Sequence, residues 1–147
     1  MENIYPYAHI IHLILAIIFL GYVFTDLAVI SALKGKFEKD TQQKINQSLG
    51  ARSFKIFPLS LLVLVLSGGI MMSRYINSDA GLFETNLQKI FLFKIFLVSI
   101  IVIGVGYNLY KKFTGGTKSE FMQHHFHKLV IVLGFLIVLS AKTMFLV

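Results

Sequence analysis

The sequence contains no cysteine and no tryptophan among its 147 residues. Without thiols the chain cannot form a disulfide, hold zinc or an iron–sulfur cluster through thiolates, or use a thiol nucleophile. Any metal must therefore be held by histidine, methionine or oxygen ligands. Charge is also scarce, because Asp, Glu, Lys and Arg together make up only 14% of the residues. Such a low charge content is not typical of a soluble domain.

The chain also lacks the signatures of conventional enzymes. It has no glycine-rich nucleotide-binding loop, no pair of carboxylates within an apolar run, and no convincing Ser-His-Asp order. If the protein carries out chemistry, a bound cofactor must supply it.

Long apolar runs are what the sequence has in abundance, with 56% hydrophobic residues. A bilayer crossing needs about 20 apolar residues in a helix, and four runs reach that length. We predict helices at about 5–33, 56–76, 90–110 and 128–146, the second with Pro58 in its first turn. The predicted fold is all-α: an integral membrane four-helix up-down-up-down bundle that forms a single transmembrane domain over 1–147.

The net charge of +7 is concentrated in two segments between apolar runs, 34–55 and 111–128. By the positive-inside rule these loops are cytoplasmic, which gives an N-out/C-out topology and indicates a bacterial inner membrane. The basic residues are thus explained by lipid and topology, and nucleic acid is not an expected partner. The lipid bilayer is the expected partner, and homo-oligomerisation stays open.

Polar side chains within the spans gather at two depths. At about 1.5 Å per residue, an outer layer lies roughly 5–10 Å below the outer interface. Its members are His12, Met71, Met72, Lys94 and Lys142, with Arg74 close by. This layer suits heme b, with His12 as iron ligand, Met72 as a second axial candidate and the cations as partners for propionates. His9 could join His12 on a metal.

A second cluster is expected toward the cytoplasm and comprises Asp26, Tyr107, Asn108, His124 and His127. It could be a metal or proton-entry site, although a solvated interfacial cluster explains the same residues. The outer layer has a comparable alternative, in which His12 is a hydrogen-bonded interfacial histidine, the methionines pack, and the lysines reach headgroups.

Helical phase gives two helices a polar seam. Every seventh residue of the first span falls on one face, since the drift is only about 20° per step. These residues are Tyr5, His12, Phe19 and Asp26. The second span carries a similar line made of Ser53, Ser60, Ser67 and Arg74. The small residues Ser67, Gly68 and Gly69 allow a backbone or a flat ligand to approach closely.

One group of membrane proteins shares several of these features: His12 and Phe19 separated by six residues, Gly21 shortly after, Lys94 near the start of the third span, and the terminal segment 141–145. The chain resembles the four-helix, heme-containing protoporphyrinogen oxidases and the related copper-resistance-D-like proteins. It departs from that pattern at Phe19, where the family usually has tryptophan, and around Asp26, where it has arginine.

The resemblance implies a histidine ligand to heme b at His12 and a catalytic lysine at Lys94, near the carboxylates of heme or porphyrinogen. It places Lys142 at the basic position that ends the fourth helix. The implied activity is oxidation of protoporphyrinogen IX, with electrons passing toward a quinone or another acceptor of the respiratory chain.

Three other functions remain open at this point. One is a b-type electron-transfer subunit that binds heme but not porphyrinogen. Another is a copper or other metal transport or resistance protein, for which His9, His12, Met71, Met72 and Met144 are candidate ligands. The third is a cofactor-free membrane scaffold whose polar seams only fix helix packing.

Overall fold

A computed structural model describes residues 3–73, 76, 84–116, 125–143 and 146, and most of these residues are helical. No β-strand occurs in these ranges. Four helical segments in them are long and apolar enough to cross a membrane: Tyr5–Leu33, Lys39–Met72, Asn86–Phe113 and Phe126–Thr143. The all-α class and the four span-length apolar helices are thereby confirmed, while the orientation of the spans stays a prediction.

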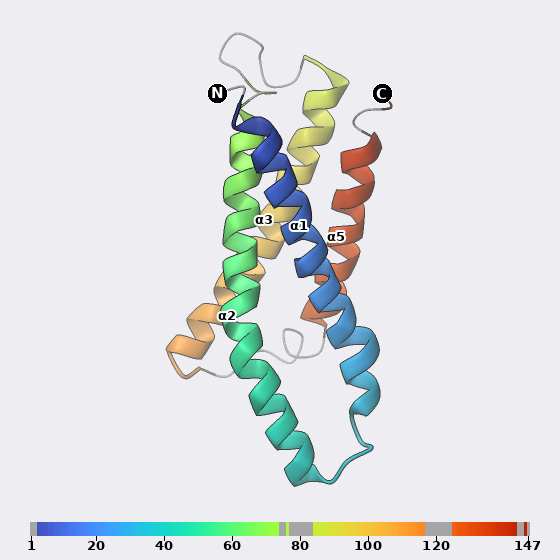
Figure 1. The fold of residues 1–147 in the computed structure, drawn as a ribbon, viewed down its shortest axis with the longest axis vertical. Helices are drawn as coiled ribbons and strands as arrows, with labels where there is room; N and C mark the ends of the chain where they lie inside the picture. Colours follow the sequence, from blue (N-terminus) through green and yellow to red (C-terminus); the bar gives the residue numbers. More distant parts are fainter. Residues whose placement is uncertain (1–2, 74–75, 77–83, 117–124, 144–145, 147) are drawn as a thin grey trace. The chain divides into compact units, whose positions relative to one another are not determined.

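The chain divides into two compact units, Met1–Met71 and Met72–Val147, called unit 1 and unit 2 below. Unit 1 contains α1 (Tyr5–Thr25), the π-helix η1 (Asp26–Ile30), the 3₁₀-helix η2 (Ser31–Leu33) and nearly all of α2 (Lys39–Met72). Unit 2 contains α3 (Asn86–Phe113) and α5 (Phe126–Thr143). Within each unit the two long helices run in opposite directions (Figure 1).

The start of α2 differs from the prediction. The helix begins at Lys39 rather than at Ile56, so most of the expected loop 34–55 is helical, and Pro58 lies inside the helix rather than in its first turn. Segment 39–55 is rich in good helix formers, and it contains no proline. Pro58 cannot donate to the carbonyl of Phe54, and Figure 1 shows that α2 changes direction along its length.

The first span changes helix type at Asp26. There α1 passes into η1, in which the N–H of Ser31 reaches the carbonyl of Asp26, five residues back. This is the π-helical pattern, and within a longer helix it shifts the phase of everything that follows. A turn with Gly35 at φ 83° then leads into α2, where the side-chain oxygen of Gln42 accepts from the Gly35 N–H at 3.5 Å.

The start of α3 is defined by a capping box. Thr85 Oγ1 accepts from the N–H of Gln88 at 3.2 Å, and Gln88 Oε1 accepts from the N–H of Thr85 at 3.2 Å. Both donors would otherwise be without a partner at the helix end. The helix thus begins at Asn86, four residues before the predicted start at Ile90, and it continues to Phe113.

Close packing in unit 2 depends on a glycine of α3. The ring of Phe126, at the start of α5, lies so close to Gly104 that a Cβ there would be 2.3 Å from Phe126 Cε2. Neighbouring core residues on the two helices, among them Ile101, Val105 and Val130, are almost fully buried. Only glycine therefore permits this approach of α3 and α5.

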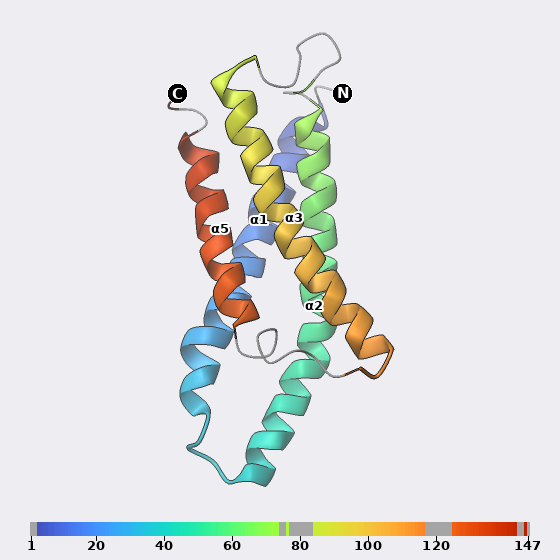
Figure 2. The same ribbon diagram turned by 180° about the vertical axis from the view of Figure 1, so that it is seen from behind.

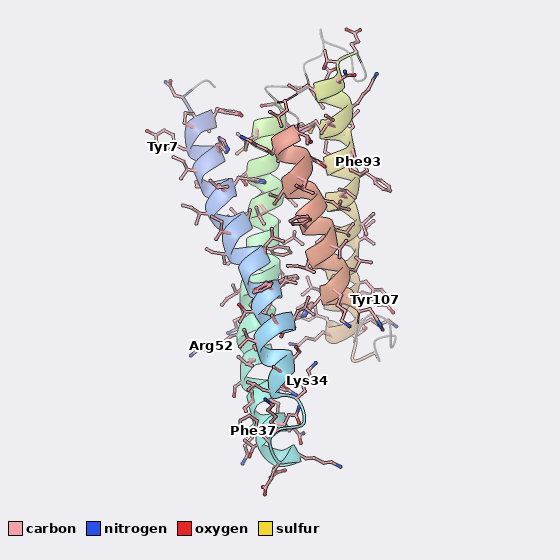
Figure 3. The ribbon with its side chains drawn as sticks, turned by 90° about the vertical axis from the view of Figure 1, so that its right-hand side faces the viewer. Tyr7, Lys34, Phe37, Arg52, Phe93 and Tyr107 are labelled. Carbon is pink, nitrogen blue, oxygen red and sulfur yellow. The ribbon has the colours of Figure 1, made fainter. Side chains whose placement is uncertain are left out.

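Large apolar side chains remain exposed along all four helices. Examples are Ile14, Leu66, Ile103 and Phe135, each more than half exposed. In Figure 3, Tyr7 on α1 and Phe93 on α3 project away from their helices. Soluble proteins rarely expose apolar surface on this scale, whereas lipid tails cover it without cost.

Candidate functional site

The side chain of His12 on α1 is hydrogen-bonded to α2. Its Nδ1 atom lies 3.0 Å from the carbonyl oxygen of Leu64 and 2.9 Å from Ser67 Oγ. The ring is partly buried, and Ser67 is buried. The two polar seams predicted from helical phase therefore meet at this point.

The partners of His12 determine which ring nitrogen carries the proton. A carbonyl oxygen can only accept, so Nδ1 must be the donor toward Leu64. Ser67 Oγ directs its own hydrogen to the carbonyl of Val63 at 2.7 Å, or to that of Leu64 at 3.1 Å, and its lone pair can accept from Nδ1–H. In the neutral ring, Nε2 is then the nitrogen with the lone pair, which is the atom that binds a metal.

The backbone of α2 also shapes the position of the His12 ring. A Cβ on Gly68 would lie 3.3 Å from His12 Cε1 and 3.7 Å from Nδ1. The next residue, Gly69, has no such neighbour within 4 Å. Gly68 thus provides a flat surface against which the imidazole rests, while the hydrogen bonds to Leu64 and Ser67 fix its rotation.

Farther along unit 1, the seam continues with aromatic and hydroxyl groups. The rings of Phe19 and Phe57 stack with centroids 4.5 Å apart, and Tyr22 lies tilted against Phe57 at 5.8 Å. The hydroxyls of Tyr22 and Ser53 lie close enough to interact. Ser60, between these levels on α2, is buried.

The other residues expected in the outer layer are placed as follows. Met71 is partly buried near the end of α2, whereas Met72, Lys142 and His9 are exposed. The ring of His9 lies beside Tyr5, with centroids 6.1 Å apart. Arg74 lies outside the described residues.

Lys94 lies deeper in its helix than the sequence suggested. Because α3 begins at Asn86, Lys94 is more than two turns inside it rather than just past its start. Its side chain is partly buried, and Nζ lies 5.8 Å from the centroid of the Phe91 ring. The aromatic face offers this cation a partial substitute for water.

The predicted inner cluster draws on both units, and its assembly stays a prediction. Asp26 begins η1 in unit 1, close enough to Tyr22 to act on it electrostatically. In unit 2 the Tyr107 ring carries Lys111 Nζ at 5.7 Å, and Asn108 Oδ1 is buried without a hydrogen-bond partner in the described structure. His127 lies against Phe126, and His124 falls outside the described residues.

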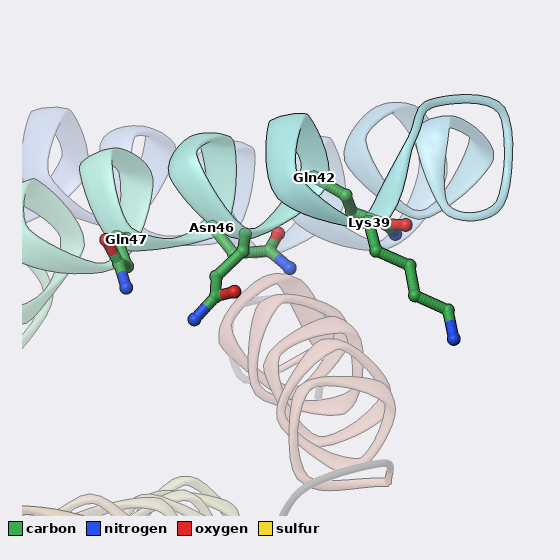
Figure 4. A pocket seen from close by; sticks show the side chains of 5 residues that line it. Lys39, Gln42, Asn46 and Gln47 are labelled. Atoms are coloured by element: carbon green, nitrogen blue, oxygen red, sulfur yellow. The ribbon is translucent and has the colours of Figure 1, made fainter.

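Within the described residues, no three side chains among His, Asp and Glu gather closely enough to hold a metal ion. A shallow polar hollow does occur on α2, along Lys39, Gln42, Gln43, Asn46 and Gln47 (Figure 4). Amide groups dominate it, and none of the residues predicted for the site contributes.

Several groups at the His12 position were not among the predicted site residues. Ser67 had been predicted as a member of the polar line with seven-residue spacing on the second span, and both Ser67 and Gly68 had been noted as small residues. The Leu64 carbonyl has no sequence signal, because every residue carries one. Comparison with protein-family models, curated proteins and solved structures found no match.

Proposed function

We propose that the chain is an integral membrane heme b protein in which Nε2 of His12 is the iron ligand. The observation that supports this is the bond from His12 Nδ1 to the carbonyl of Leu64 and to Ser67. Metal-ligating histidines commonly donate their other ring N–H to a carbonyl, which fixes the tautomer and ring orientation and raises the basicity of the ligand.

The set of available ligands also favours heme over a zinc ion. A dedicated zinc site needs several protein ligands, and the described residues hold no cluster of three His, Asp or Glu. A porphyrin supplies four nitrogens itself, so one or two protein ligands suffice. One well-oriented imidazole beside a glycine therefore suits a flat, mostly apolar cofactor.

The remaining outer-layer residues receive supporting roles in this proposal. Met72, or Met71 one residue earlier, is the candidate for the second axial position. The cations Arg74, Lys94 and Lys142 would pair with propionate carboxylates. A lysine within an apolar span is costly, which is why such residues usually serve a specific partner.

The activity we propose is oxidoreduction, with protoporphyrinogen IX as the first substrate to test and a quinone or respiratory-chain component as acceptor. Heme b supplies one-electron redox chemistry when bound. The chain itself would supply His12 as an oriented ligand and the positive charge of Lys94 for the carboxylates of heme or porphyrinogen. Its apolar helices would keep water away. We place the protein in a bacterial inner membrane, with both chain ends outside.

The test is the visible spectrum of the detergent-purified protein, produced with an adequate heme supply, before and after reduction with dithionite. We expect a Soret band and reduced α and β bands in the wild type. His12→Ala should remove them. His9→Ala is the matched control, because it deletes an exposed imidazole one turn away on the same helix, and it should keep them.

A colourless wild type would refute the heme proposal, whereas a Soret band that survives His12→Ala would refute His12 as the iron ligand. If heme is bound, porphyrin formation by wild type and Lys94→Ala separates an oxidase from an electron carrier. An oxidase loses turnover but keeps heme in Lys94→Ala, whereas an electron carrier never oxidises porphyrinogen.

A further inference from the structure

We propose that Ser67 is a positioning residue that sets the electron donation of His12 toward the iron. This inference rests on the proposed function, because the iron is the group that would respond. It concerns a hydroxyl of α2 that lies 2.9 Å from the imidazole of His12, which belongs to α1.

Two acceptors share the single N–H of His12. The Leu64 carbonyl is fixed by the helix, whereas Ser67 Oγ passes its own hydrogen to the Val63 carbonyl at 2.7 Å. Each bond in such a chain polarises the next, so the serine oxygen becomes a better acceptor than an isolated hydroxyl. Ser67 is only 5% exposed, and bulk water does not compete with it.

The chemical consequence follows from the direction of donation. A stronger bond from Nδ1–H pushes electron density to Nε2, which makes the ligand more basic and stabilises ferric over ferrous iron. Removing the Ser67 acceptor weakens that effect, so the reduction potential should become more positive. The Leu64 carbonyl remains, and heme binding should therefore persist.

A redox titration of the purified holoprotein tests the inference in three serine variants. Ser67→Ala should shift the midpoint potential upward with heme content unchanged, and Ser67→Thr should restore the wild-type value because it keeps the hydroxyl. Ser60→Ala is the matched control, since Ser60 is a buried serine two turns away on the same helix, and it should not shift the potential.

A readout that needs no heme runs in parallel. The ¹⁵N NMR shifts of the His12 ring in the protein prepared without heme should show protonated Nδ1 in wild type and Ser60→Ala, and more protonated Nε2 in Ser67→Ala. Ser67→Cys keeps the volume and offers a weaker acceptor, so it should give an intermediate result even if the alanine variant folds poorly.

Identical potentials and tautomers in Ser67→Ala and Ser60→Ala would overturn the role of Ser67, whatever the fate of heme. A colourless wild type would overturn the proposed function instead, and the NMR comparison would still decide whether Ser67 controls the tautomer. The two failures are therefore distinguishable.

Discussion

At the scale of single residues, the polar side chains of α1 in unit 1 find polar partners on α2. An unpaired polar group in hydrocarbon costs several kcal/mol, so a histidine and a tyrosine inside α1 require partners. His12 finds them in Leu64 and Ser67, and Tyr22 finds one in Ser53. Both pairs join α1 to α2, and both can be tested separately.

The contact of Gly68 with His12 predicts a position-specific effect of one methyl group. Gly68→Ala would place its Cβ 3.3 Å from His12 Cε1, so the ring must shift slightly and its hydrogen bonds should weaken. Gly69→Ala gains the same helix propensity without a neighbour. In detergent, we expect Gly68→Ala to be less stable than Gly69→Ala by roughly 1–3 kcal/mol. Equal stabilities would contradict the close approach.

The interaction between the hydroxyls of Tyr22 and Ser53 can be measured by a double-mutant cycle. Tyr22→Phe and Ser53→Ala each remove one partner, and the double variant corrects for their separate effects. Hydrogen bonds between membrane helices contribute about 0.6 kcal/mol on average, and we expect a coupling energy of this size. A coupling of zero would mean that the two hydroxyls do not depend on each other.

The sequence could predict part of this pairing. Seven-residue spacing indicated that His12 and Ser67 lie on the polar faces of their own helices. It could not tell which member of one seam meets which member of the other, because that depends on the vertical register of α1 and α2. The Leu64 carbonyl could not be identified either, since backbone acceptors leave no trace in residue type.

At the scale of the helix, apolarity predicted the spans well and the start of α2 poorly. An apolar run shows where a helix can contact lipid, but it does not show at which residue the helix begins. In α2 the two boundaries lie far apart, at Lys39 for the helix and near Ile56 for the apolar part. Thirty-four residues make a helix about 51 Å long, well beyond the roughly 30 Å of a hydrocarbon core. The polar half must therefore extend beyond the hydrocarbon.

The π-helix at Asp26–Ile30 is a second feature that periodicity could not reveal. Sequence phase assumes 3.6 residues per turn throughout, and one wider turn breaks that assumption. The assumed period applies to the α-helical residues up to Thr25, whereas the phase of residues after η1 has to be taken from the structure.

The packing of α3 on α5 predicts that Gly104 does not tolerate a side chain. Gly104→Ala would place a Cβ 2.3 Å from the buried Phe126 ring and should lower stability by roughly 1–3 kcal/mol. Gly106→Ala, on the same helix and without a neighbour within 4 Å, is the control and should be neutral or slightly stabilising.

A compensating substitution tests the cause of that loss. In Gly104→Ala combined with Phe126→Leu, the shorter side chain vacates the space that the new methyl group needs. The double variant should be more stable than the sum of the two single losses predicts. Strict additivity, measured by thermal unfolding in detergent, would show that the ring and the glycine are not in contact.

At the scale of the whole molecule, apolar exposure and charge support different conclusions. The exposed apolar faces of all four helices, with Leu66 as an example, support burial in lipid. They do not indicate which end of each helix faces the cytoplasm. Direction rests only on the basic residues of 34–55 and 111–128, through the positive-inside rule. Composition was therefore sufficient to predict helices that can span a membrane, whereas the orientation of these helices needs a measurement.

The absence of cysteine makes that measurement direct, because any introduced thiol is the only one in the chain. A membrane-impermeant maleimide applied to intact cells should label Glu84→Cys and spare Lys44→Cys. In inverted vesicles the pattern should reverse. Leu66→Cys, in the apolar part of α2, should react from neither side, because a thiol in hydrocarbon does not ionise to the reactive thiolate. Labelling of Lys44→Cys in intact cells would reverse the proposed orientation and would place the His12 end of α1 on the cytoplasmic side.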